Sequence, residues 1–142
     1  MTKNKVSSEL KSLDRLVGTW KITGDATGTT EYKWSEGGLF LIKDVDMEYA
    51  GKQIKGIEFI GHLHKVGKKP TEEIWSRFYH FTEGLTLDYV YQMHDNTLTI
   101  WFEEKDANNF YTGTFDKQGK SIKGAWQWPG GGYSIVAEKV EK

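Results

Sequence analysis

From Gly18 onward, hydrophobic and polar residues alternate along the chain with a period of two. The clearest run extends from Leu85 to Met93, where every second residue is apolar or aromatic. A similar run covers residues 39–49, with acidic residues in the opposite phase. This period is typical of β-strands with one buried face, and turn-forming residues separate about ten such segments. No later window has the spacing of an amphipathic helix, so the sequence predicts about ten strands.

The N-terminal segment has a helical period instead. Its apolar residues at positions 10, 13, 16 and 17 fall on one face of a helix. Ser7 or Ser8 is placed to cap the first free backbone N–H groups, and Gly18 to end the helix. We therefore expect one domain over residues 1–142, with a helix at about 8–17 and a barrel at about 18–140.

The order of the elements predicts how the strands pair. About ten short strands with tight turns and no crossover helix favour antiparallel pairing between consecutive strands. Closure removes the exposed edges of such a sheet, so the expected fold is all-β, an antiparallel up-and-down barrel. At this strand number the interior either holds a small molecule or is filled by large aromatic side chains.

Composition and charge narrow the possible partners. The 142 residues carry 19 Lys and Arg against 20 Asp and Glu, a net charge of −1, which gives no field to attract nucleic acid or an anionic membrane. The chain has no cysteine, which excludes disulfides, thiolate metal sites and thiol nucleophiles. No apolar run approaches the length of a membrane span, and the first residues lack the apolar core of a secretory signal. We expect a cytoplasmic protein without a nucleic-acid or membrane partner.

Several short motifs resemble those of a known barrel family. Gly18-Thr19-Trp20 resembles the Gly-x-Trp signature of the lipocalin and calycin barrels, in which the Trp plugs the base. Further similar segments are residues 37–41, 56–63, 76–79, 87–91 and 124–133. Over about Leu13 to Lys139 the chain resembles small, uncharacterised bacterial lipocalin-like proteins of the calycin superfamily. This resemblance implies a calycin-type barrel with a short helix across one end, and implies no particular activity.

Charged residues within apolar strands are the first candidate ligand-binding groups. Glu58 and Arg77 each lie mid-strand, where a charge is costly unless it is paired or hydrated. In one interpretation Arg77 binds a carboxylate or phosphate of a ligand inside the barrel, while Glu58 and nearby tyrosines orient it. In the other, Arg77 and Glu58 form a buried ion pair, or Arg77 points outward. The tyrosines that would orient the ligand in the first interpretation are Tyr79, Tyr89 and Tyr91.

Two histidines suggest a metal site. His62-x-His64 places two imidazoles on one side of a strand, and a third ligand from a neighbouring strand would complete a site. The alternative is that His64 faces solvent and His62 belongs to a polar patch. Haem would require a ligand motif that is not matched here. We therefore predict no metal and no cofactor, and keep His62 as a ligand-binding candidate.

The tryptophans have two possible roles as well. Trp101 or Trp126 could line an aromatic pocket, and both could equally fill the barrel core.

Two other segments are poor candidates for chemistry. Asp44, Asp46 and Glu48 line one face that is expected to be solvated, so they are poor general acids or bases. The residues 129–132 have the composition of a hairpin loop and lack the helix of a phosphate-binding loop.

Three functions remain open from the sequence. The first is binding of a small amphiphilic, hydrophobic or aromatic ligand inside the barrel. The second is an enzyme of unknown reaction that uses Arg77 with Glu58 or His62. The third is a packed barrel that acts through its surface, possibly as a homodimer. The sequence leaves the strand register open, and a single bulge would exchange the inward and outward faces.

Overall fold

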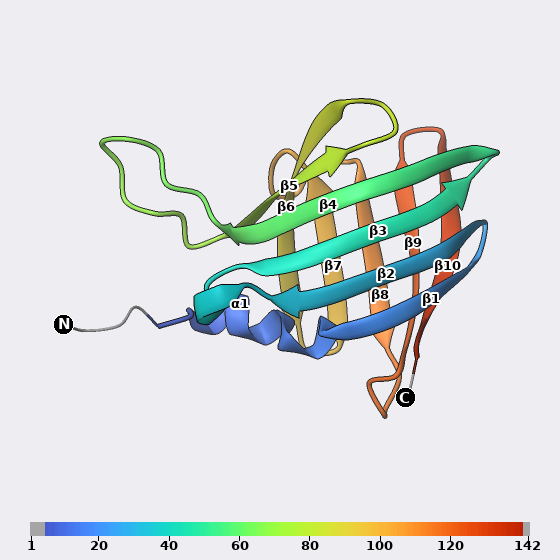
Figure 1. The fold of residues 1–142 in the computed structure, drawn as a ribbon, viewed down its shortest axis with the longest axis horizontal. Coiled ribbons are helices and arrows are strands. Elements are labelled where there is room, and N and C mark those ends of the chain that lie inside the picture. Colours follow the sequence, from blue (N-terminus) through green and yellow to red (C-terminus); the bar gives the residue numbers. More distant parts are fainter. Residues whose placement is uncertain (1–4, 141–142) are drawn as a thin grey trace.

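The computed structural model describes residues 5–140 and shows a single closed barrel (Figure 1). Two short helical segments precede it, α1 (Ser8–Lys11) and the 3-10 helix η1 (Ser12–Leu16). The strands of the barrel are β1 (Gly18–Gly24), β2 (Ala26–Trp34), β3 (Leu41–Tyr49), β4 (Lys52–His62), β5 (Ile74–His80), β6 (Leu85–His94), β7 (Thr97–Phe102), β8 (Phe110–Phe115), β9 (Ser121–Trp128) and β10 (Gly131–Lys139). A second 3-10 turn, η2 (Glu36–Gly38), lies between β2 and β3.

Every strand pairs antiparallel with its neighbour in sequence, and β1 also pairs with β10. Trp20 is opposite Lys139 in that last pairing, which closes the sheet and leaves no unpaired edge. The predicted all-β up-and-down barrel of about ten strands is therefore confirmed. One turn is shorter than expected, because Gly131 and Gly132 belong to β10 and pair with Trp128 and Gln127.

The N-terminal helix lies across one end of the barrel (Figure 1). The side chain of Ser7 accepts a hydrogen bond from the Leu10 backbone N–H, which confirms Ser7 as the cap. Leu10, Leu13 and Leu16 point into the core and are 1% exposed. The indole N–H of Trp20 donates to the Leu16 carbonyl at 2.8 Å, so that the helix and the first strand close this end together. No helix within residues 5–140 is long and apolar enough to cross a membrane.

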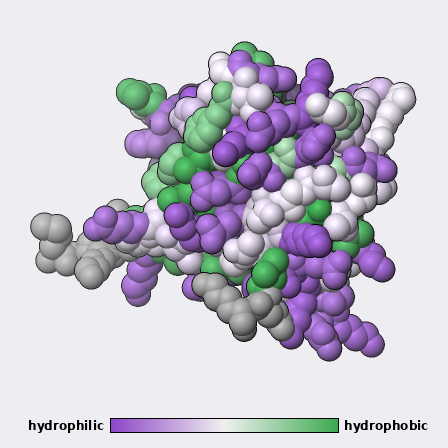
Figure 2. All heavy atoms as spheres, turned by 45° about the vertical axis from the view of Figure 1, so that its right-hand side comes forward, coloured by the Kyte–Doolittle hydropathy of each residue, from purple (hydrophilic) through white to green (hydrophobic). Residues whose placement is uncertain are grey.

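Alternation along each strand separates an inner from an outer face. On β3, Leu41 and Val45 are buried, whereas Asp46 and Glu48 are exposed, as the period of two predicts. Figure 2 shows hydrophilic residues over much of one side of the molecule, with hydrophobic residues between them.

Part of the outer face is also buried. Trp75, Val90, Trp101 and Phe110 are successive cross-strand partners on β5, β6, β7 and β8. Val90 is 1% exposed and Trp101 8% exposed, although neither belongs to the core cluster inside the barrel. This outer aromatic row covers its own strands, which explains how a residue can be buried without facing the interior.

Candidate ligand-binding site

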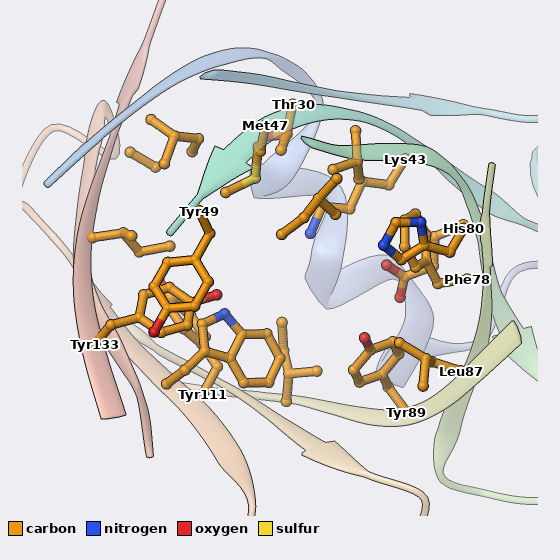
Figure 3. Close-up of a pocket in the computed structure, with 18 of the residues that line it drawn as sticks. Thr30, Lys43, Met47, Tyr49, Phe78, His80, Leu87, Tyr89, Tyr111 and Tyr133 are labelled. Carbon is orange, nitrogen blue, oxygen red and sulfur yellow. The ribbon is translucent and has the colours of Figure 1, made fainter. Parts of the chain in front are cut away.

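The barrel encloses a cavity of about 570 Å³ (Figure 3). Side chains from all ten strands line it, and most of them are aliphatic or aromatic. This volume is within the usual range for small-molecule sites, which are mostly apolar with a few polar groups that orient the ligand. The interior is therefore hollow, and the aromatic residues form its wall without filling it.

The cavity has a floor and a mouth. Leu16 and Trp20 lie at the floor, where the helix closes the barrel. The lining residues that belong to turns, Ala50 and Glu83 among them, come from the connections between β3 and β4, β5 and β6, and β7 and β8. In an up-and-down barrel these connections all lie at the end opposite the helix, so the cavity opens there.

Aromatic rings surround the part of the cavity near this mouth. Tyr49 and Tyr133 are stacked with their ring centroids 4.1 Å apart, and Trp128 meets Tyr133 edge to face at 6.0 Å. Trp126 contacts Phe102 at 5.3 Å. Burial raises the pKa of Tyr133 to about 12, so its hydroxyl is neutral at ordinary pH. These rings offer flat apolar surfaces with a few hydroxyl and indole donors.

A row of polar side chains crosses the deeper part of the cavity. Tyr32 on β2 pairs with Lys43 on β3, and Lys43 pairs with Glu58 on β4, so the three face inward side by side. The Lys43 amine is 5.3 Å from the centre of the Tyr32 ring. Figure 3 shows this amine pointing into the open space. The row introduces both a cation and an anion into an otherwise apolar wall.

Glu58 is almost completely buried, with 3% of its surface exposed. The hydroxyl of Tyr91 donates a hydrogen bond of 2.7 Å to its Oε2. Burial raises the pKa of Tyr91 well above its ordinary value, and the negative charge of Glu58 adds to this effect. Tyr91 therefore remains a neutral donor that stabilises the carboxylate.

The charge of Lys43 is also maintained inside the barrel. Burial by itself lowers the pKa of Lys43, but the phenolic oxygen of Tyr32 and the Glu58 carboxylate raise it by more. The pKa is thus above its ordinary value, and the amine is an ammonium group at neutral pH. Some of its surface remains accessible because the side chain borders the cavity.

His80 adds a titratable group nearer the mouth. Its ring lies on β5, is 8% exposed and lines the cavity. Its Nε2 is 4.0 Å from Oε2 of Glu83, while its Nδ1 has no hydrogen-bond partner within residues 5–140. The ring is therefore a buried polar group in the cavity wall.

Four of the residues that the sequence suggested line this cavity. Glu58 is joined there by Tyr89, Tyr91 and Trp126, from β6 and β9. Tyr89 contacts Trp126 with ring centroids 6.0 Å apart, and burial raises its pKa above the ordinary value. The other four suggested residues lie outside the cavity.

Arg77 and Tyr79 point away from the barrel interior. Arg77 is paired in register with Phe59, and its guanidinium donates two hydrogen bonds to Asp88, from Nε at 2.7 Å and from Nη2 at 3.1 Å. Tyr79 is 41% exposed. The inward positions of β5 are 74, 76, 78 and 80, so residues 77 and 79 have the opposite phase. Of the placements that the sequence left open for Arg77, the outward one is found, and the interpretations that place Arg77 inside the barrel or in an ion pair with Glu58 are wrong.

Trp101 and His62 lie outside the cavity for different reasons. Trp101 faces outward and packs in the outer aromatic row beside Val90. His62 has the phase of Glu58 but lies beyond the floor, where its Nε2 is 2.7 Å from Ser7 Oγ and its Nδ1 is 2.6 Å from the Thr71 carbonyl. His64 contacts the Lys68 carbonyl instead, and no group of three potential metal ligands is found within the described residues.

Sequence reasoning missed Tyr32, Lys43 and His80 as cavity residues. Lys43 is the informative omission, because it has the same phase as Leu41 and Val45 in the alternating run. A lysine at an inward position of a half-buried strand was the sequence signal that could have identified Lys43 as a cavity residue. His80 had such a signal too, since it has the same phase as Ile74 and Phe78.

Comparisons with other proteins give no further assignment. No family model matches this chain, and no curated protein matches it. The site is therefore interpreted from its own geometry.

Proposed function

We propose that this protein binds a small amphiphilic or aromatic molecule inside its barrel. The observation that carries the proposal is the 570 Å³ cavity with an aromatic mouth and a buried polar row. A cavity of this size and lining would bury most of a small ligand's apolar surface, at roughly 25 cal/mol per Å². The closed ten-stranded barrel with a helix across one end further supports the interpretation of the chain as a calycin-like protein.

The test uses N-phenyl-1-naphthylamine, a neutral aromatic probe whose fluorescence increases in apolar surroundings. We expect saturable binding with a stoichiometry near one. Met47→Trp fills the cavity from β3, where Met47 points inward (Figure 3), and is expected to weaken probe binding at least fivefold. Glu48→Trp is the matched control, because the next residue on the strand is exposed outside.

Two outcomes would count against the proposal. One is that the wild-type protein does not bind the probe. The other is that Met47→Trp and Glu48→Trp bind it equally well while both remain folded by circular dichroism, which would locate the probe on the surface.

A further inference from the structure

We propose that Lys43 binds the acidic head group of the ligand, so that the natural ligand class is organic anions, such as carboxylates, with an apolar or aromatic body. This inference rests on the proposed function and specifies the ligand class of the same site. It starts from the Lys43 ammonium group, which belongs to the deep part of the cavity and points into the open space (Figure 3).

The ammonium group of Lys43 has no anion in direct contact. Among the ion pairs of residues 5–140 within 4.0 Å, none involves Lys43. Glu58 is its register partner, yet that carboxylate is engaged by the Tyr91 hydroxyl at 2.7 Å. The Lys43 side chain instead lies beside the Tyr32 ring. Tyr32 and Glu58 thus lie on the strands at either side of the ammonium group, which also borders the open cavity.

An anion is the best occupant of that position. A cationic head group would be repelled by the ammonium, and a neutral acceptor would gain less than a charged one, since hydrogen bonds between ionised groups are about twice as strong as neutral ones. The low polarity of the surrounding wall strengthens this pairing relative to water. The Glu58 carboxylate on the next strand repels a bound anion. Removing its charge should therefore leave anion affinity unchanged or raise it, whereas removing the Lys43 charge should lower it.

The shape of the cavity also orients the ligand. Lys43 and Tyr32 lie on the deep row, two inward positions below Met47 on β3, whereas the stacked Tyr49 and Tyr133 lie towards the mouth. A ligand with its acid group on Lys43 would therefore place its apolar body among the aromatic rings. The acid group would enter first, and the distal end would lie nearest the solvent.

The decisive experiment compares two probes that share one aromatic body. 1-Anilinonaphthalene-8-sulfonate is the anionic counterpart of neutral N-phenyl-1-naphthylamine. Lys43→Met is expected to weaken binding of the anion at least tenfold and of the neutral probe less than threefold. Lys43→Arg keeps the cation and should retain most of the anion affinity. Lys33→Met removes a lysine from the outer face of β2 and should change neither affinity.

Glu58→Gln separates a charge effect from a general loss of polarity. The amide still accepts the Tyr91 hydrogen bond but removes the negative charge. Anion affinity is therefore expected to stay the same or rise. A fall in anion affinity in Glu58→Gln, or an equal effect of Lys43→Met on both probes, would overturn the assignment to Lys43. Failure of the wild type to bind either probe would instead contradict the binding function itself.

A measurement on the wild type covers the case in which Lys43→Met does not fold. 9-Anthracenecarboxylate and its methyl ester are compared as competitors that displace N-phenyl-1-naphthylamine at neutral pH. The acid should displace the probe at a concentration at least tenfold lower than the ester, despite the greater hydrophobicity of the ester. Equal or better displacement by the ester would overturn the proposal.

Discussion

Tyr91 and Glu58 form a buried hydrogen bond across the interior of the barrel. They belong to β6 and β4, which β5 separates, and the Tyr91 hydroxyl is 2.7 Å from Glu58 Oε2. A buried carboxylate is costly unless it is hydrogen-bonded or paired. The bond therefore links two strands that do not pair directly and helps to keep a charge within an apolar wall.

Removing this bond is expected to destabilise the fold. Tyr91→Phe should lower the free energy of unfolding by about 1–3 kcal/mol, because the Glu58 carboxylate loses its donor while still buried. Urea denaturation measures the change. Tyr111→Phe is the matched control, since Tyr111 is also buried but its hydroxyl makes none of the hydrogen bonds found among residues 5–140. Equal losses in the two variants would contradict the role of the bond.

Arg77→Ala is expected to leave ligand binding unchanged. The guanidinium lies outside the barrel and pairs with Asp88, whose pKa it lowers through their hydrogen bond. Such exposed pairs contribute little to stability, and salt screens them further. Titration with N-phenyl-1-naphthylamine at low and high salt measures the effect. A severalfold loss of affinity would show that Arg77 contributes to the site after all.

Trp126 and Trp101 should respond differently to the same substitution. Trp126→Ala removes part of the cavity wall and is expected to weaken probe binding at least threefold. Trp101→Ala should lower stability by about 3 kcal/mol, as large-to-small changes at buried tryptophans do, yet leave the probe affinity of the folded protein unchanged. Fluorescence titration combined with urea denaturation distinguishes the two. A reversed pattern would mean that the inner and outer faces had been exchanged.

Stability is expected to decline at high pH. Burial raises the pKa of Tyr89, Tyr91, Tyr111 and Tyr133 above 10, to about 12 for Tyr133. In the unfolded chain these phenols ionise near 10, so the unfolded state loses protons first as the pH rises. Their contribution is complete below about pH 10 and is lost progressively as the pH rises towards the folded values.

Urea midpoints measured from pH 8 to pH 11.5 test this expectation, with tyrosinate absorbance at 295 nm followed in parallel. Most of the absorbance change of these four residues should accompany unfolding. Tyr133→Phe should reduce the decline. A reversible absorbance change near pH 10 by all tyrosines, without loss of structure, would contradict the burial of these phenols.

The candidate site was less accessible to sequence reasoning than the fold. Glu58, Tyr89 and Tyr91 were recognised because polar or aromatic residues stand out within alternating strands. Arg77 stood out for the same reason, but the phase of β5 places it outside, since Phe78 is the inward residue there. A strand with apolar residues in both phases leaves that choice open, and only its partners decide it.

The sequence by itself determined the approximate number of strands, their order and an N-terminal cap at Ser7 or Ser8. These features depend on local periodicity, turn chemistry and capping, which act between residues close in the chain. The tertiary structure alone decided that Tyr32, Lys43 and Glu58 stand in one row and that Tyr91 reaches Glu58. Those relationships depend on the register between strands and on closure of the barrel, which join residues far apart in the chain and set what faces the cavity.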